Sequence, residues 1–89
     1  MKGGMNLVIS KKFEREFQKF SSEIKIRADE IVKILENNVN DSRLHLHKLH
    51  GPLKDYWSVR VNFQIRILIQ IGDDDTIVLC RIGDHSLYE

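Results

Sequence analysis

Four side chains in the second half of the chain are of the types that can cut RNA: Arg60, Arg66, His85 and Tyr88. RNA is cleaved without a metal when the ribose 2′-hydroxyl attacks its own phosphate. That reaction needs a base for the hydroxyl, an acid for the leaving oxygen, and positive charge near the phosphate oxygens. An imidazole suits acid or base duty near neutral pH, and guanidinium groups hold phosphate. Tyr88 can stack on a base, donate a hydrogen bond, or act as an acid beside a cation.

Residues 56–83 contain three successive apolar runs with the spacing of β-strands. Apolar and polar residues alternate over 56–61 and again over 63–71, which predicts two strands that each bury one face. Phe63 falls with the isoleucines on the buried face of the second strand. The run TIVLCRI, residues 76–82, is apolar on both faces and predicts a central, covered strand.

The same alternation decides where the arginines lie. Arg60 and Arg66 fall on the face opposite Trp57 and Ile65, so we expect both on the open face of a sheet. Arg81 belongs to the covered strand, and its face is not fixed by the pattern. The C-terminal histidine and tyrosine follow that strand directly, which places them near one end of the sheet.

The first half of the chain predicts a short strand and two helices. Residues 5–9 are apolar and stop at Ser10, a suitable N-cap. One apolar stripe at helical spacing follows, and the pair Ser21-Ser22 begins a second helix with its own stripe. We expect both stripes to be buried against the sheet. They consist of Phe13, Phe17 and Phe20 in the first helix, and of Ile24, Ala28, Ile31 and Leu35 in the second.

Residues 40–55 show neither the helical nor the strand spacing of apolar residues, and they contain His45, His47 and His50. A zinc site is one interpretation of this H-x-H-x-x-H run, but it has no cysteine and no nearby acid except Asp55. The other interpretation is a loop of surface histidines beside the sheet, of which one or two touch an anionic ligand. We favour the second and expect no metal and no cofactor.

Two further features have structural explanations. Gly72 and the three aspartates after it predict a hairpin turn, because the alternating ligands and distal glutamate of a calcium loop are absent. Cys80, the single cysteine, has no partner for an internal disulfide and falls within an apolar run. It therefore indicates a buried thiol rather than a nucleophile.

Length and composition are those of one small globular domain. We expect a single domain over residues 1–89, with residues 1–4 as a disordered tail. No apolar run approaches the roughly 18–20 residues of a membrane span, and the lone cysteine fits a reducing cytoplasm. Net charge is only +1, yet residues 42–71 carry five Lys or Arg and one acid, whereas residues 72–89 carry five acids and one Arg. Positive charge is thus concentrated in the middle of the chain.

The order strand–helix–helix–strand–strand–strand, with short links between the last three strands, predicts an α+β fold. In it a small antiparallel sheet packs on the N-terminal helical hairpin and leaves its other face partly open.

Two runs, KLHGPLKDYWSVRVNFQIRILIQI and IVLCRIGDHSLYE, resemble the RelE/ParE superfamily of bacterial type II toxin–antitoxin toxins, especially the RelE-type mRNA interferases. The shared pattern is a K-L-x-G turn, an aromatic-led strand ending in Arg, a strand that starts R-I/L, and a closing R-I-G-x-[HR]…Y. The resemblance covers nearly the whole chain and implies a small antiparallel sheet on a helical hairpin.

The resemblance also implies an activity: binding at the ribosomal A site and cleavage of mRNA there, with a cognate antitoxin that holds the toxin inactive. In this interpretation Arg66 stabilises the phosphate, and Arg60 is a basic residue one strand earlier. His85 takes the place of a catalytic Arg or His, and Tyr88 that of an aromatic residue that stacks or donates a proton. We expect a hetero-oligomer with the antitoxin and a cytoplasmic location.

Three further side chains are expected to bind RNA: Lys54, His50 and Arg81. Departures from the family pattern leave other functions open. Ser58 stands where some relatives have a catalytic lysine, the C-terminal histidine and tyrosine are one residue closer together than in several relatives, and a net charge of +1 is low for docking on ribosomal RNA. The alternatives are a ParE-like toxin that inhibits DNA gyrase without cutting RNA, and a toxin-like binding module without activity.

Overall fold

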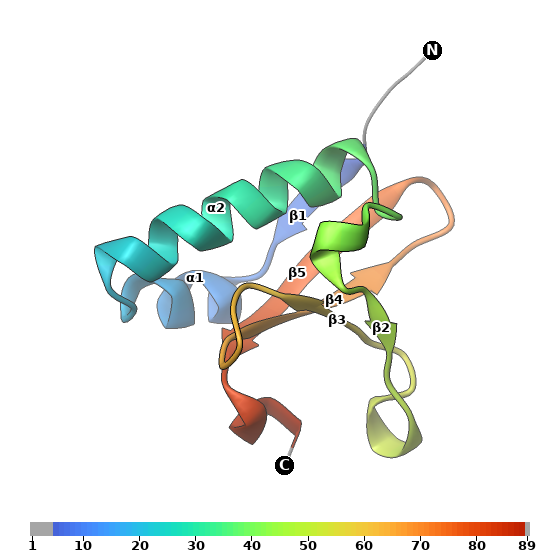
Figure 1. The fold of residues 1–89 in the computed structure, drawn as a ribbon. Helices are drawn as coiled ribbons and strands as arrows, with labels where there is room; N and C mark the ends of the chain where they lie inside the picture. The colour runs from blue at the N-terminus through green and yellow to red at the C-terminus, as the bar shows by residue number, and fades with distance from the viewer. Residues whose placement is uncertain (1–4, 89) are drawn as a thin grey trace.

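The computed structural model describes residues 5–88, which form a curved five-stranded sheet with two α-helices (Figure 1). The tail expected at residues 1–4 lies outside the described residues. In chain order the main elements are β1 (Asn6–Ile9), α1 (Lys11–Gln18), α2 (Ser22–Asn37), β2 (His47–Lys48), β3 (Trp57–Arg60), β4 (Arg66–Ile71) and β5 (Thr76–Gly83). The short 3-10 helices η1 (Ser42–Leu44) and η2 (Gly51–Leu53) lie on either side of β2 in the chain, and η3 (His85–Tyr88) follows β5.

Serine hydroxyl groups begin both α-helices, as predicted from the sequence. Ser10 Oγ accepts a hydrogen bond from the Phe13 amide at 3.0 Å, and Ser21 Oγ accepts one from the Ile24 amide at 3.3 Å. The Ser10 hydroxyl also donates to the Cys80 carbonyl at 2.9 Å, which ties the start of α1 to β5. Within residues 5–88 no helix has the length and apolar character to cross a membrane.

The strands are arranged in the order β1-β5-β4-β3-β2, and the predicted α+β fold is confirmed. One detail of the prediction is wrong: the sheet is mixed, because β1 pairs parallel with β5 while the other pairs are antiparallel. The helical hairpin connects β1 to the rest and returns the chain in the same direction, whereas short turns join β3, β4 and β5. The two-residue strand β2 was also not predicted, since it lies in the stretch without periodicity.

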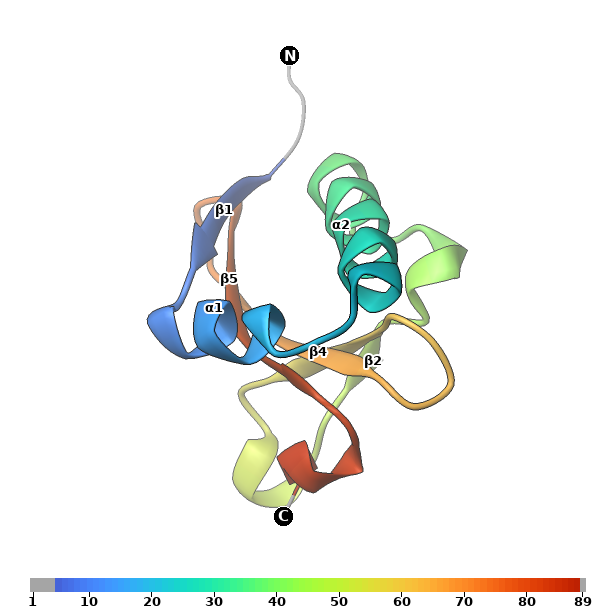
Figure 2. The same cartoon turned by 90° about the vertical axis from the view of Figure 1, so that its left-hand side faces the viewer.

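The sheet curves around α2, which lies against its concave side, whereas η2 and η3 lie on the other side (Figure 2). Side chains of both helices and of the strands fill the space between, and the predicted stripe residues Ala28, Ile31 and Leu35 are fully buried. The convex side is partly covered as well. There Ser58 and Leu68, which are cross-strand partners, are 5% and 2% exposed.

Phe63 does not belong to the core, contrary to the prediction: its side chain is 86% exposed. Residues 62–65 form a turn instead of the start of a strand, because Asn62 Oδ1 accepts hydrogen bonds from the amides of Gln64 (2.9 Å) and Ile65 (2.7 Å). Such side-chain bonds to nearby amides compete with extended backbone. Phe63 therefore projects from the turn, while Ile65 is buried as predicted.

A bulge in β5 changes the position of Cys80. Leu68 lies opposite Arg81, but the next residue of β4 lies opposite Leu79, so Cys80 is the extra residue. The bulge lets Leu79 and Ile82 both face the core although their numbers differ in parity. Cys80 is half-buried rather than a core residue as predicted. Burial raises the pKa of its thiol, which makes it a poor nucleophile near neutral pH.

Candidate functional site

A cleft of about 430 Å³ opens on the convex side of the sheet, and we call it the sheet cleft. Its lining residues come from β3, β4, the segment that contains β2, and η3. Strands β3 and β4 lie between β2 and β5 in the sheet (Figure 1). Three of the four predicted catalytic residues meet here: Arg60, Arg66 and Tyr88. The full lining consists of His45, Leu46, His47, Ser58, Arg60, Arg66 and Tyr88.

The two arginines of the sheet cleft are cross-strand partners on β3 and β4. Like charges at opposing positions destabilise a sheet, so an anion shared by Arg60 and Arg66 would relieve their repulsion. Arg66 Nη1 donates to the Asn62 carbonyl and, at 3.2 Å, to the Ile65 carbonyl. The Arg60 Cζ lies 5.9 Å from the centre of the Phe63 ring, and its buried Nε has no hydrogen-bond partner within residues 5–88.

Tyr88 reaches the sheet cleft because η3 packs on the end of β5. Leu87 is 4% exposed and lies so close to Gly83 that a Cβ there would be 3.0 Å from Leu87 Cδ2. Asp84 accepts a hydrogen bond from the Ser86 amide at 2.9 Å, and this bond holds the pKa of the carboxyl below its ordinary range. One short turn of helix is thus fixed at its start and at its buried leucine.

His85, the fourth predicted catalytic residue, lies beside the sheet cleft rather than in its lining. Its ring centre is 5.9 Å from that of Tyr88. The imidazole itself borders a neighbouring cleft of about 470 Å³, together with Gln64, Ile65, Asp84 and Ser86. His85 therefore lies next to the sheet cleft only through its contact with the ring of Tyr88.

Two histidines that the sequence did not assign to the site, His45 and His47, line the sheet cleft. They reach it because β2 adds to the edge of the sheet, where His47 lies opposite Ser58 of β3. The sequence predicts surface histidines beside the sheet, of which one or two touch an anion. It predicts no strand in this stretch, so it does not indicate that they face the C-terminal residues. Two histidines at alternate positions before an extended segment are the signal that could have found them.

The three residues expected to bind RNA lie outside the sheet cleft. Lys54 and His50 are exposed at either end of η2. Arg81 donates two hydrogen bonds, of 3.2 and 2.7 Å, to Glu16 of α1. Burial alone would raise the pKa of Glu16, but the hydrogen bonds from Arg81 and from the Ile82 amide outweigh it and hold that pKa below its ordinary value. Arg81 thus links β5 to α1 through its bonds to Glu16 and does not line the sheet cleft.

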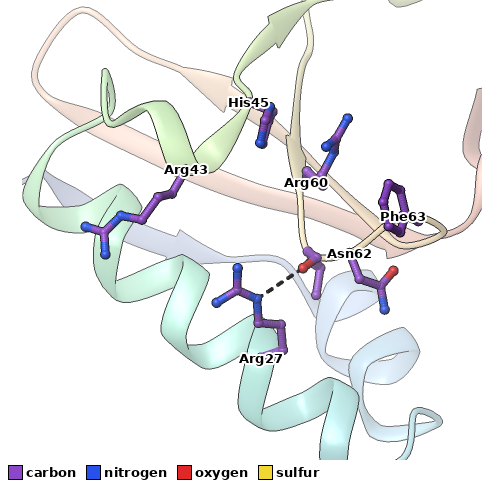
Figure 3. A pocket seen from close by; sticks show the side chains of 7 residues that line it. Arg27, Arg43, His45, Arg60, Asn62 and Phe63 are labelled. Atoms are coloured by element: carbon purple, nitrogen blue, oxygen red, sulfur yellow. Dashed lines mark hydrogen bonds between the residues drawn. The ribbon is translucent and has the colours of Figure 1, made fainter.

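A second cleft, of about 270 Å³, adjoins the first and shares Arg60 and His45 with it (Figure 3). We call it the flanking cleft. It lies where α2, η1 and the turn after β3 come together, and Arg27 Nε donates to the Val61 carbonyl at 3.3 Å across it. The lining residues are Arg27, Arg43, His45, Arg60, Val61, Asn62 and Phe63.

The chemistry open to the sheet cleft follows from its donors. Residues 5–88 contain no group of three His, Cys, Asp or Glu side chains placed to hold a metal ion. Guanidinium groups donate to an anion in a fixed fork, imidazoles exchange protons near neutral pH, and a phenol donates a proton or stacks. These groups together can hold a phosphate and transfer protons around it.

A small sheet curved around a helical hairpin is the fold that the resemblance to the RelE/ParE class of toxins implies. Residues 7–87 match the family described as "ParE toxin of type II toxin-antitoxin system, parDE". The chain belongs to this family and is a type II toxin–antitoxin toxin of the RelE/ParE superfamily. Comparison with curated protein sequences gives no significant match.

Solved structures of toxins share the fold. The RelBE2 toxin–antitoxin complex from Mycobacterium tuberculosis contains a chain with 20% identity and a TM-score of 0.77, over 92% of this chain and 99% of that one. The archaeal RelE–RelB complex from Pyrococcus horikoshii gives 20% identity and a TM-score of 0.76, over 91% and 94%. The DinJ–YafQ complex from E. coli gives 17% and 0.76, over 94% and 96%. At these identities the likeness concerns the fold.

Proposed function

We propose that this toxin is an endoribonuclease that cleaves mRNA on the ribosome. The observation that carries the proposal is the sheet cleft, where two opposed arginines, two histidines and the C-terminal tyrosine surround one space. The resemblance to RelE-type interferases supports the same activity, and the archaeal RelE–RelB complex from Pyrococcus horikoshii contains a chain with the same fold. Such a toxin acts in the cytoplasm, where the ribosomes are.

In this proposal Arg60 and Arg66 hold the non-bridging oxygens of the scissile phosphate. The 2′-oxygen forms a bond to phosphorus as the bond to the 5′-oxygen breaks, which leaves a cyclic phosphate and a free 5′-hydroxyl. Attacking and leaving oxygens lie roughly in line, so the base and the acid belong on opposite sides of the phosphate.

The sheet order supports such a division of roles. His47 comes from the β2 side of the sheet cleft and Tyr88 from the β5 side, with β3 and β4 between them. We assign to His47 the removal of the 2′-hydroxyl proton, and to Tyr88 the donation of its phenolic proton to the 5′-oxygen. His85, beside the Tyr88 ring, returns a proton to the phenolate.

Cleavage of mRNA on translating ribosomes, read by mapping new 5′ ends, tests the proposal. Tyr88→Phe and His47→Ala should each reduce cleavage by about 10²–10⁴-fold, and Arg66→Ala by about 10²–10³-fold. His85→Ala should reduce it less, because its ring meets the cleft only through Tyr88. Arg15→Ala is the control, an exposed arginine of α1 outside the lining, and should cleave normally. Wild-type cleavage by both the Tyr88 and Arg66 variants would refute the proposed site.

Inhibition of DNA gyrase is the second candidate, favoured by the family description, which names ParE. In that case the protein inhibits supercoiling by purified gyrase, and mRNA on ribosomes stays intact. Tyr88→Phe should then leave inhibition unchanged, because no proton transfer is involved. A protein that does neither is a binding module without activity.

We also propose a cognate antitoxin as partner, since the RelBE2 and DinJ–YafQ structures are toxin–antitoxin complexes. On this chain β1 leaves Val8 and Ile9 49% and 51% exposed, and Ile9 borders an apolar cleft of about 220 Å³ between α1 and α2. A partly disordered antitoxin that folds on binding would cover this surface. The product of the neighbouring reading frame should co-purify with the wild-type chain and not with Ile9→Glu. Co-purification with both would show that the antitoxin binds a different surface.

A further inference from the structure

The flanking cleft is strongly cationic. Arg27, Arg43, Arg60 and His45 line it, and no carboxylate does. The acidic partners of two of these arginines are outside the lining: Asp41 accepts from Arg43 at 2.8 Å, and Glu30 accepts from Arg27 at 3.3 Å. The Arg27–Glu30 pair is exposed on both sides, at 48% and 59%, so an incoming anion displaces it at little cost. The Arg43 side chain is 65% exposed and donates two bonds to Asp41, which is 21% exposed, so it meets an anion with its remaining N–H donors.

One donor in the cleft has no acceptor. Arg60 Nε is buried and has no hydrogen-bond partner within residues 5–88. Buried donors without a partner are rare in native proteins. Arg60 belongs to both clefts, and so does His45, which has a left-handed backbone with φ of 48° at the end of η1. The two clefts are therefore adjoining parts of one cationic surface.

An aromatic ring stands at the edge of the flanking cleft. Phe63 is 86% exposed, because the turn that the Asn62 side chain stabilises directs its ring into solvent. Arg60 lies 5.9 Å from the ring centre, so a cation and an aromatic face are presented together. Single-stranded nucleic acid is bound by this combination, with bases stacked on aromatic rings and phosphates held by cations.

We propose that the flanking cleft binds the nucleotide next to the scissile phosphate, with its base stacked on Phe63 and its own phosphate held by Arg27 and Arg43. This inference rests on the proposed ribonuclease function, because it extends the RNA from the sheet cleft through the shared Arg60. An acidic peptide would use the arginines and leave Phe63 without a role, whereas a nucleotide uses both.

Binding of a 2′-O-methyl hexauridylate, which has no 2′-hydroxyl to react, tests the inference by fluorescence anisotropy across a range of KCl concentration. Phe63→Ala should weaken binding by about 5- to 150-fold, the range of one base–aromatic stack. The logarithm of the association constant falls as the logarithm of the salt concentration rises. Arg43→Ala and Arg27→Gln should each make this slope shallower by about 0.7, because each removes one phosphate contact. The 2′-O-methyl diuridylate contains the scissile phosphate and no second one. Arg43→Ala and Arg27→Gln should therefore bind it as wild type does, whereas Phe63→Ala should weaken its binding as well.

Matched controls come from residues that line neither cleft. Ile26, 63% exposed on α2, is replaced by Ala as the control for Phe63, and the exposed Arg15 of α1 by Ala as the control for the arginines. Neither change should affect hexauridylate binding. Thermal unfolding of each variant is compared with wild type, because Arg27 also donates to the Val61 carbonyl. Within residues 5–88 the Arg43 side chain donates to Asp41 and to no backbone carbonyl of another element. If the Arg27 variant unfolds, the Arg43 variant alone therefore decides whether the cleft binds phosphate.

The outcomes separate this inference from the proposed function. Wild-type binding by the Phe63 and Arg43 variants, with loss of both ligands in Arg66→Ala, overturns the flanking site and keeps the ribonuclease. No hexauridylate binding by the wild-type chain, with no mRNA cleavage, removes both. A glutamate decapeptide that binds through Arg43, while hexauridylate does not, reassigns the cleft to an acidic protein segment and overturns the inference.

Discussion

Asn62 determines more of the sheet cleft than its exposed position suggests. Its side-chain oxygen accepts from two amides of the turn, and its carbonyl accepts from Arg66 Nη1. The same turn projects Phe63 into solvent and positions Arg60 and Arg66 on the two strands that it joins. The two arginines to which we assign the phosphate therefore depend on a polar side chain that does not line the sheet cleft.

Replacing Asn62 by Ala should lower the free energy of unfolding by about 1–2 kcal/mol, because two turn hydrogen bonds are lost. Cleavage of mRNA should fall as well, through weaker positioning of Arg66. Asn62→Asp keeps an oxygen acceptor at the same place and should restore stability. Urea denaturation followed by fluorescence of the single tryptophan, Trp57, measures the first effect. An Ala variant as stable and active as wild type would show that the backbone forms this turn unaided.

The last helical turn, η3, is the element on which the tyrosine of the site depends. It is held by buried Leu87 against Gly83 and by the Asp84 hydrogen bond to the Ser86 amide. A glycine is needed here for close approach rather than for its backbone freedom, since a Cβ at Gly83 would meet Leu87 Cδ2 at 3.0 Å and Cγ at 3.2 Å. An added Cβ requires Leu87 to give way by a few tenths of an ångström, and because Leu87 fixes η3 we expect Tyr88 to move with it.

Gly83→Ala should therefore reduce cleavage toward the level of Tyr88→Phe. The overlap costs about 1–3 kcal/mol if the structure resists it, but η3 is a terminal turn and should detach at a small cost to the melting temperature. Amide exchange at Leu87 and Tyr88 reports that detachment. Gly72→Ala is the control, because its nearest neighbour is the exposed Asp74 side chain at 3.3 Å, which can move away. Normal cleavage by the Gly83 variant would mean that η3 tolerates the added methyl group in place.

Local sequence patterns predict most helices and strands of this fold correctly. The wrong predictions concern features that depend on interactions outside any local pattern. Serine caps and apolar stripes predicted α1 and α2 because a helix satisfies its own backbone. Strand β2 was missed, since two residues have no period, and so His47 was not placed in the sheet cleft. The parallel pairing of β1 and the bulge at Cys80 depend on residues far apart in the chain. Phe63 was misplaced because one asparagine side chain outweighed the alternation of its neighbours.

In the molecule as a whole, α1 completes the sheet as well as covering it. Strand β1 ends at Ile9, which leaves the second half of β5 without a neighbouring strand on that side. Glu16 of α1 takes that place: its Oε1 accepts from the Ile82 amide at 3.1 Å, and its Oε2 accepts from Arg81. One carboxylate thus joins the helical layer to the sheet, and its charge strengthens the bonds from Arg81.

Global stability should therefore depend on the ionisation of Glu16. Its pKa in the folded state lies below the ordinary value of 4.5, because the bonds from Arg81 and Ile82 outweigh the effect of burial. The unfolded chain then binds more protons than the folded one in the window below about 5, so stability is fully present above the unfolded pKa and is lost as pH falls through the folded pKa. Glu16→Gln should lower the free energy of unfolding by about 1 kcal/mol at pH 7, since the Arg81 side chain is 35% exposed and the solvent screens the pair.

Urea denaturation of wild type and Glu16→Gln at a series of pH values isolates this contribution. Asp41, whose hydrogen bond from the Arg43 side chain lowers its pKa to about 2, and Asp84, whose pKa is lowered by the Ser86 amide, titrate in both proteins and cancel in the difference. The difference between the two proteins should be largest near neutral pH and should shrink toward zero as the solution is acidified past the folded-state pKa of Glu16. A difference that stays constant over this range would mean that Glu16 acts through the shape of its side chain, and that the junction of α1 with β5 does not depend on charge.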